Sequence, residues 1–187
     1  MYNLVVFASG NGSTLQAIID NINSGNLKAN IQLVVSNNPN AFALSRAQNA
    51  NIPTYIIKSK LPSEIDAELL DVLSHYDVDL IVLAGYLKLI GSGLINKYAI
   101  INTHPALLPK YGGKGMYGMN VHRAVINANE TKSGVTLHYV NEKYDSGDII
   151  SQTVVDVFPE DTPEDLAARV QRAEKIQLIN VLKEFEK

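Results

Sequence analysis

The amino-acid sequence predicts an α/β protein with a doubly wound, mostly parallel sheet and antiparallel strands toward its C-terminal end. Three observations support this prediction. Short apolar runs alternate with segments of helical periodicity in the first half of the chain, as in a parallel sheet with helices on both faces. Two long alternating runs then follow each other with only a short connection, as antiparallel neighbours do. A long amphipathic segment at the end predicts a final helix.

The first half of the chain reads as strand and helix in turn. Fully apolar runs indicate buried strands, whereas apolar residues three or four positions apart indicate helices. Right-handed crossovers between parallel strands then place helices on both faces of the sheet. The predicted strands are residues 4–8, 31–35, 54–57 and 79–84, and the predicted helices are residues 15–20, 41–50 and 64–75.

The regular alternation of strands and helices ends in the second half of the chain. Residues 98–101 form a β-like approach to a polar segment, residues 120–125 have a helical pattern, and residues 135–140 and 149–155 alternate as an antiparallel pair. The final helix is expected to begin at Thr162-Pro163-Glu164, with threonine as N-cap, proline at the first helical position and an acidic side chain in the first turn.

Composition limits the class of protein. The chain has 187 residues, enough for a single domain over residues 1–187 with a core of its own. Its 16 Lys and Arg and 19 Asp and Glu give a formal charge of -3, which argues against a nucleic-acid partner. We expect no membrane partner and a cytoplasmic location, because the apolar run at the N-terminus is too short to cross a bilayer and no cysteine is present. The missing cysteines also exclude thiolate catalysis and zinc-thiolate sites.

A glycine-rich segment, Ser9-Gly10-Asn11-Gly12-Ser13-Thr14, links the first strand to the first helix. Exposed amides and the dipole at a helix start favour anions. The dinucleotide pattern is incomplete and the lysine of a triphosphate-binding loop is missing. We therefore expect a single phosphate here, with a plain glycine turn as the alternative.

Asn102-Thr103-His104-Pro105 is the strongest candidate for chemistry. Positions i and i+2 of a strand share a face, so Asn102 and His104 are expected to face one substrate atom. One would serve as a neutral hydrogen-bond donor and the other as a titratable donor or base. Ligands of open α/β sheets bind beyond the carboxyl ends of the strands, where Ser9–Thr14 would also lie. The alternative is a structural histidine that bonds a loop carbonyl.

Asp145 could complete an Asn/His/Asp group. A carboxylate beside His104 would raise the imidazole pKa and keep the ring protonated, which makes it an acid. Asp148 is a competing candidate, and both lie in an Asp/Gly-rich turn where they could simply shape the backbone. His122 and His138 are interpreted first as packing or hydrogen-bonding residues. A zinc site built from histidines is conceivable, but no known ligand spacing supports it, and no metal is expected.

Four segments together resemble the folate-dependent phosphoribosylglycinamide formyltransferase family of purine biosynthesis. They are Phe7–Ile18, Leu83–Lys88, Asn102–Tyr111 and Ser133–Val140. The similarity covers nearly the whole chain, and the four segments occur in the same order as in the family. The resemblance implies a Rossmann-type, formyltransferase-like fold, with a phosphate-binding half at about residues 1–100 and a folate-binding and catalytic half at about residues 101–187.

The resemblance also implies a reaction and its residues. A formyl group would pass from 10-formyltetrahydrofolate, as co-substrate, to the amine of 5-phosphoribosylglycinamide through a tetrahedral intermediate. Catalytic roles fall on Asn102, His104 and Asp145. Contacts to phosphoribosylglycinamide are implied for Gly12, Ser13, Thr14 and Glu174. The folate pocket would comprise Leu87, Lys88, Leu89, Ile90, Asn102, Asn141, Glu142, Lys143, Tyr144 and Asp145.

The sequence departs from the family pattern in two places. After the third predicted strand, many relatives carry an arginine for the glutamate tail of the folate, whereas this chain offers Lys58 and Lys60. Lysine supplies a point charge without the bidentate fork of arginine. The connection at residues 112–121 is also longer and richer in glycine than the commonest form. Mobility of that loop is expected.

Alternatives within and outside the family remain. Other enzymes that use 10-formyltetrahydrofolate, a sugar-nucleotide formyltransferase or formyltetrahydrofolate hydrolase, share the chemistry but usually carry additional domains, as does methionyl-tRNA formyltransferase. A non-catalytic sugar-phosphate binding module would use the glycine-rich helix start but gives Asn102 and His104 no common task. The expected partners are small-molecule substrates, and the chain is expected to be a monomer or a homodimer.

Overall fold

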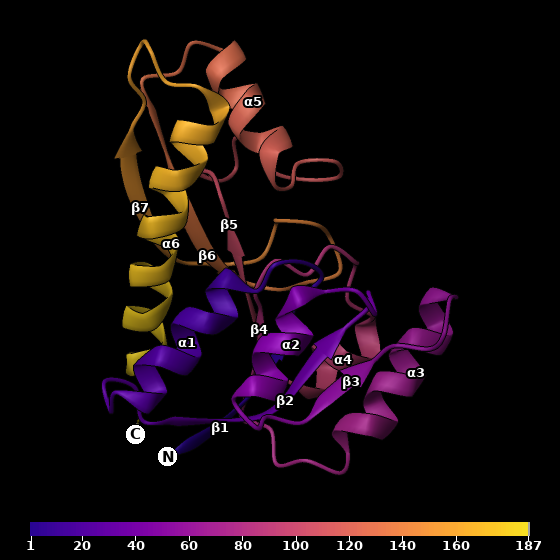
Figure 1. Ribbon diagram of the computed structural model, residues 1–187. Coiled ribbons are helices and arrows are strands. Elements are labelled where there is room, and N and C mark those ends of the chain that lie inside the picture. Colours follow the sequence, from indigo (N-terminus) through magenta and orange to yellow (C-terminus); the bar gives the residue numbers. More distant parts are fainter. Residues whose placement is uncertain (187) are drawn as a thin grey trace.

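The structure is a computed structural model that describes residues 1–186. Its strands are β1 (Tyr2–Phe7), β2 (Ala29–Ser36), β3 (Thr54–Ile56), β4 (Leu80–Leu83), β5 (Ile100–His104), β6 (Lys132–Tyr139) and β7 (Ile149–Asp156). Its helices are α1 (Ser13–Asn23), α2 (Phe42–Asn49), α3 (Pro62–Leu73), α4 (Ser92–Lys97), α5 (Met119–Asn127) and α6 (Pro163–Glu184). Figure 1 shows their arrangement.

All seven strands form one sheet in the order β3-β2-β1-β4-β5-β6-β7. The first five strands pair in parallel. β6 is antiparallel to both β5 and β7. The predicted fold class is therefore confirmed, including the antiparallel strands near the C-terminal end.

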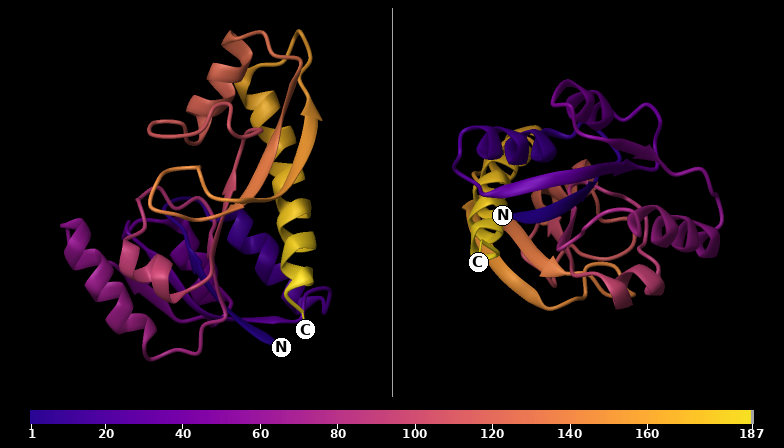
Figure 2. Two further views of the ribbon diagram at one scale, coloured as in Figure 1. Left: turned by 180° about the vertical axis from the view of Figure 1, so that it is seen from behind. Right: turned by 90° about the horizontal axis from the view of Figure 1, so that it is seen from below.

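Helices cover both faces of the sheet, as Figure 2 shows from two further directions. Alternate side chains of β1 divide between the two layers. Leu4 and Val6 belong to the core cluster that includes side chains of α1, α2, α5 and α6, whereas Val5 and Phe7 belong to the cluster that includes side chains of α3 and α4. All four side chains are fully buried. The uninterrupted apolar sequence of this strand follows from burial on both of its faces.

Two elements differ from the prediction. α4 was not expected; it is a six-residue helix preceded by Gly91, whose sequence SGLINK is too short to show helical periodicity. β5 extends through His104 rather than ending at Ile101. The start of α6 is as predicted, because Thr162 and Asp165 form a reciprocal capping box and Pro163 follows the cap.

The order of strands reverses between β1 and β4. β1 leads to β2 and β3 on one side, and β4 leads to β5 on the other. Chain segments that leave the carboxyl ends of β1 and β4 therefore diverge and open a crevice, the usual ligand site of such sheets. Within the described part of the chain, no helix is long and apolar enough to cross a membrane.

Candidate active site

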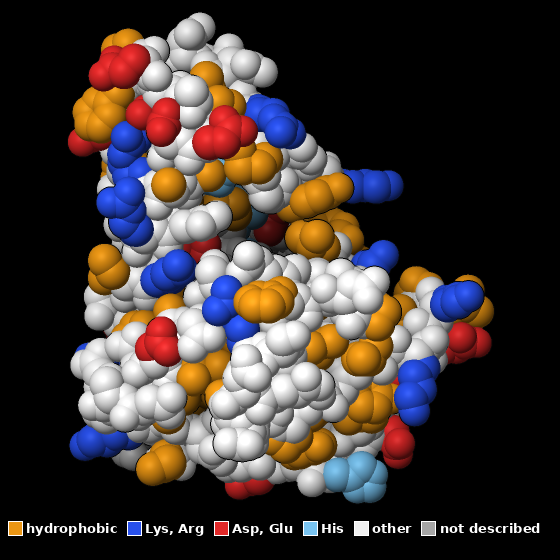
Figure 3. Space-filling model, in the orientation of Figure 1, with side chains coloured by type: hydrophobic (Ala, Val, Ile, Leu, Met, Phe, Trp, Pro, Cys, Tyr) orange, Lys and Arg blue, Asp and Glu red, His pale blue; other side chains and the backbone are white. Residues whose placement is uncertain are grey.

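A cavity of about 680 Å³ lies at this reversal point. Its walls come from the segments after β1 and β4, the end of β5, the 113–118 loop and the β6–β7 connection, with one side closed by α6. The hollow is visible in Figure 3 near the middle of the face shown, with acidic and histidine side chains at its base. Its volume suits a ligand of metabolite or cofactor size.

The glycine-rich segment forms one wall of this cavity. Gly10 to Thr14 all line it, and Gly12 is the N-cap of α1. No side chain caps this helix start, so its first amides are directed at the cavity side with the positive end of the helix dipole. Gly12 has a φ of 74°, and a Cβ atom there would lie 2.7 Å from Ala43. The turn therefore requires glycine at this position.

Glu174 of α6 connects two of these walls. Its Oε1 atom accepts hydrogen bonds from the hydroxyl of Thr14 at 2.9 Å and from that of Thr103 at 3.0 Å. Burial raises the pKa of the Glu174 carboxyl, although both hydroxyl bonds oppose this shift. The carboxyl group thus joins the start of α1 to β5 at the edge of the cavity.

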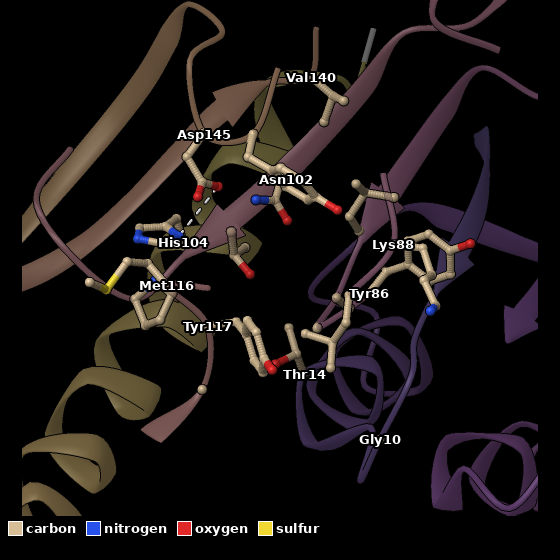
Figure 4. A pocket seen from close by; sticks show the side chains of 18 of the residues that line it. Gly10, Thr14, Tyr86, Lys88, Asn102, His104, Met116, Tyr117, Val140 and Asp145 are labelled. Carbon is tan, nitrogen blue, oxygen red and sulfur yellow. Dashed lines mark ion pairs between the residues drawn. The ribbon is translucent and has the colours of Figure 1, made fainter. Parts of the chain in front are cut away.

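Asn102 and His104 project from the end of β5 into the same cavity, as the strand alternation predicted (Figure 4). The ring of His104 is buried, and its Nε2 atom lies 2.8 Å from the carbonyl oxygen of Tyr111. A carbonyl oxygen only accepts, so Nε2 carries a proton. The other ring nitrogen of His104, Nδ1, lies on the side of Asp145.

Asp145 lies beside that nitrogen. Its Oδ1 atom is 3.4 Å from Nδ1 of His104, and its Oδ2 atom accepts the backbone N–H of Gly113 at 2.8 Å. Burial alone would raise the pKa of the Asp145 carboxyl, but the neighbouring rings of His104 and His138 and the Gly113 amide hold the pKa well below its usual range. The carboxylate is thus ionised, and its negative charge lies directly beside the His104 ring.

A close backbone approach fixes the turn that carries Asp145. A Cβ atom on Gly147 would lie only 1.7 Å from the carbonyl oxygen of Tyr139. Asp145 itself has a φ of 52°, a conformation that aspartate tolerates better than most residues. The competing candidate, Asp148, is exposed and lies outside the cavity wall. The structure therefore brings Asp145, and not Asp148, to His104.

Two further histidines line the cavity, and the sequence predicted for both a packing or hydrogen-bonding role. Nε2 of His138 lies 3.1 Å from Nδ2 of Asn102. His122 is buried on α5, its Nδ1 atom has no hydrogen-bond partner among the described residues, and burial together with the charge of His104 lowers its pKa to about 4. His122 is thus neutral near pH 7. The hydrogen bond of His138 agrees with the predicted hydrogen-bonding role, whereas the position of both rings at the cavity wall was not predicted.

Most, but not all, of the residues predicted to bind folate line the cavity. Leu87, Lys88, Leu89 and Ile90 line the cavity, as do Asn141, Lys143 and Tyr144. Glu142 is exposed and is not part of the wall, because it lies on the outer side of the β6–β7 turn. Lys58 and Lys60 are also outside the wall, whereas the ammonium-bearing side chains of Lys88, Lys114 and Lys143 belong to it.

The arrangement supports acid–base and electrostatic chemistry. It combines a buried carboxylate, an imidazole beside it, a carboxamide and an anion-binding helix start around one cavity. Across residues 1–186, no three His, Cys, Asp or Glu side chains are grouped so as to hold a metal ion. Fold and site together define a doubly wound α/β protein with a ligand-sized cavity, lined by acid–base groups, at the reversal of its strand order.

Comparison with known proteins identifies the family. The Formyl transferase family matches residues 2–182, and the chain belongs to it. Phosphoribosylglycinamide formyltransferase of Haemophilus influenzae is 41% identical over 179 residues, covering 93% of this chain and 82% of that protein. The chloroplastic phosphoribosylglycinamide formyltransferase of Arabidopsis thaliana is 40% identical over 185 residues, which are 96% of this chain but 63% of that protein. This chain thus spans less than two thirds of the plant protein's length.

A solved structure extends the comparison to three dimensions. The phosphoribosylglycinamide formyltransferase of Coxiella burnetii superposes with a TM-score of 0.89 at 41% identity, covering 97% of this chain and 85% of that one. The resemblance inferred from the four sequence segments is therefore confirmed at the level of the family and of the fold.

Sequence reasoning missed several residues of the wall, among them Tyr86, Thr103, His122, His138 and Gln171. Thr103 lay between the two chosen residues and was passed over because strand alternation directs it to the opposite face. It reaches the site through its bond to Glu174. His138 pairs with Asn102 across β5 and β6, and no pattern in the sequence gives that register.

Proposed function

We propose that this chain transfers a formyl group from 10-formyltetrahydrofolate to the amine of 5-phosphoribosylglycinamide. The observation that carries this proposal is the convergence of Asn102, His104 and Asp145 at the cavity that the start of α1 also faces. Family membership and the names of the relatives support the choice of substrates.

The substrates are proposed to occupy two parts of the cavity. The phosphate of phosphoribosylglycinamide binds the amides at Gly12, Ser13 and Thr14, where the helix dipole favours an anion. Glu174 binds the ribose or glycinamide part. The folate lies between the 87–90 segment and the 141–145 turn, because residues of both segments line the cavity. Lys88, Lys114 and Lys143 replace Lys58 and Lys60 as candidate partners of its glutamate tail.

The proposed chemistry is direct transfer. The amine nitrogen bonds to the formyl carbon and the carbonyl oxygen becomes an oxyanion. Collapse breaks the bond between that carbon and the folate nitrogen, which takes up the proton lost by the amine. One N–H of Asn102 and the Nδ1–H of His104, shared with Asp145, stabilise the oxyanion. Asp145 pairs with the His104 ring and helps to move the proton, directly or through water.

One assay tests this function. Wild-type protein is mixed with 10-formyltetrahydrofolate and phosphoribosylglycinamide, and tetrahydrofolate formation is followed by absorbance. We expect turnover that requires both substrates. Release of formate without phosphoribosylglycinamide would instead indicate the hydrolase, and binding of the sugar phosphate without turnover would indicate a binding module.

Location and assembly belong to the same proposal. A cytoplasmic enzyme agrees with a chain that has no cysteine to form disulfides. We propose a monomer or a homodimer, to be decided by light scattering of the purified protein. Small metabolites are its proposed partners, in agreement with its formal charge of -3.

A further inference from the structure

His138 and Asn102 face each other across adjacent antiparallel strands. Their Cα atoms are register partners in the β5–β6 pair. The His138 side chain is buried, with 2% of the residue exposed, while Asn102 is half-buried and borders the cavity. His138 therefore lies beside Asn102 at the cavity wall, largely shielded from solvent, where its ring reaches the carboxamide.

The surroundings of His138 determine its tautomer. Its Nδ1 atom lies 2.8 Å from the carbonyl oxygen of Tyr139. Because that oxygen can only accept, the ring proton is on Nδ1. Nε2 of the neutral ring then has a lone pair, which accepts an N–H of Asn102 at 3.1 Å.

This bond orients the carboxamide of Asn102. With Nδ2 bound to His138, Oδ1 is directed to the cavity side, as Figure 4 shows. Rotating the amide by half a turn would set Oδ1 against the lone pair of Nε2, an arrangement of two acceptors with no hydrogen bond. The histidine thus selects one of the two orientations of a nearly symmetric group.

We propose that His138 is a positioning residue for formyl transfer, acting through the orientation of Asn102. This inference rests on the proposed function. Oδ1 on the cavity side accepts an N–H of the attacking amine and directs the lone pair of its nitrogen at the formyl carbon, while the second N–H of Asn102 remains available to the oxyanion. The resulting preference for one attack geometry lowers the barrier without direct contact between His138 and substrate.

Asp145 is the other side chain near enough for His138 to position. Its Oδ1 atom lies 3.7 Å from Nε2 of His138, too long for a hydrogen bond. His104 is closer to the same carboxylate, at 3.4 Å. The contact with Asn102 is therefore the one through which His138 acts.

Two conservative substitutions test the contacts of the two ring nitrogens of His138 separately. In His138→Gln, an amide oxygen takes the place of Nε2 and can still accept from Asn102. In His138→Asn, the amide nitrogen takes the place of Nδ1 and keeps only the bond to the Tyr139 carbonyl. We expect kcat close to that of the wild type for His138→Gln and about tenfold lower for His138→Asn, with the KM of both substrates nearly unchanged. A merely structural role would give the two variants equal kcat.

Ser133→Ala provides a matched control. Ser133 lies on β6 and is buried, with a hydroxyl that has no partner among the described residues. Its removal tests whether any polar loss in this strand lowers turnover, and we expect kcat to stay unchanged. A comparable loss in Ser133→Ala would overturn the proposal.

A double-mutant cycle tests the route of the effect. If His138 acts through Asn102, His138→Asn will lower kcat no further in an Asn102→Ala background. Full additivity of the two losses would contradict the proposal and point to Asp145 instead.

The tautomer can be measured without any reaction. Long-range ¹H–¹⁵N correlation spectra of the wild-type imidazoles should show His138 protonated at Nδ1 and unprotonated at Nε2 near pH 7. A proton on Nε2 would overturn the proposal even if the variants were to fold poorly. Wild-type protein without turnover would refute the proposed function and leave this measurement valid, so the two failures are distinguishable.

Discussion

Oδ1 of Asp145 lies 3.4 Å from Nδ1 of His104, and both side chains are shielded from solvent, with relative exposures of 10% and 4%. The carboxylate also accepts the Gly113 amide, so a protein group stabilises its negative charge before any substrate binds. In a buried site, a carboxylate and an imidazole at this distance interact more strongly than they would at the surface. The pair therefore places a nitrogen donor and an ionised acid at the point where the proposed oxyanion forms.

Asp145→Asn should abolish most of the turnover. The amide preserves the shape of the side chain but removes the negative charge beside His104 and the group that helps to move the proton, so we expect kcat to fall by about 10²-fold or more. Binding of phosphoribosylglycinamide, measured by calorimetry, should change little. Asp148→Asn, three residues along the same turn and exposed, is the control and should retain wild-type kcat. Retained turnover in Asp145→Asn would exclude Asp145 from the chemistry.

Asn102→Ala should lower kcat by about 10²- to 10³-fold, the usual loss when one donor to an oxyanion is removed. The KM of both substrates should stay within a few fold, because the carboxamide acts mainly in the transition state. Steady-state kinetics with each substrate varied in turn measure both quantities. A rise in KM with unchanged kcat would show that Asn102 binds substrate without stabilising the intermediate.

Glu174→Ala should weaken the binding of phosphoribosylglycinamide without affecting the binding of 10-formyltetrahydrofolate. It removes the acceptor shared by Thr14 and Thr103, so we expect the KM for phosphoribosylglycinamide to rise at least about tenfold. The KM for 10-formyltetrahydrofolate should be unchanged. Glu184→Ala, an exposed glutamate of the same helix, is the matched control. Equal effects on both substrates would argue against the proposed division of the cavity.

Gly12→Ala should destabilise the fold by about 1–3 kcal/mol, because alanine must adopt a positive φ there. Its Cβ atom would also meet the backbone of Ala43 at 2.7 Å. Gly10→Ala is the comparison, since a Cβ atom there has no neighbour within 4 Å. Urea unfolding at pH 7 gives both values. Equal destabilisation by the two substitutions would show that the strained turn at residue 12 is unimportant.

His122 should make the protein less stable in acid. The unfolded chain binds a proton at this residue near the ordinary histidine pKa of about 6.5, while the folded chain does so only near pH 4. Lowering the pH therefore favours unfolding, with a contribution of about 2 kcal/mol at pH 5. Stability from this source is fully present above pH 6.5 and is lost progressively down to pH 4.

Urea unfolding at pH 7 and pH 5 checks this expectation. His122→Leu should reduce the loss of stability between the two pH values, because the buried ring no longer titrates. His75→Gln, at an exposed histidine, should leave the loss as in the wild type. If His122→Leu were as sensitive to acid as the wild type, the acid sensitivity would have to originate elsewhere.

The architecture could be predicted because burial on both faces gives a parallel strand a continuous apolar sequence. Residues 4–8, 31–35 and 79–84 show that signal, and the strands lie there. α4 could not be predicted in the same way, since six residues do not complete two turns of apolar repeat. Its position depends on tertiary bonds: Asp66 of α3 accepts the amides of Gly93 and Leu94.

The candidate site was predictable where neighbours in sequence are neighbours in space. Asn102 and His104 share a strand, and strand alternation places them together. The choice of Asp145 over Asp148 depends on the path of a turn, and the contact of His138 with Asn102 depends on strand register. Neither the path of the turn nor the strand register can be predicted from the local periodicity of the sequence. Glu174 was found only by resemblance, because nothing in its helix distinguishes it from other glutamates.

The tight approach of Gly147 to the Tyr139 carbonyl has a consequence for mutational tolerance. Any side chain at residue 147 would displace the backbone that presents Asp145, two residues away. Random mutagenesis under selection for the proposed formyl transfer should therefore find position 147 almost as intolerant as position 145. A residue with no functional group would then be as indispensable as the acid it positions.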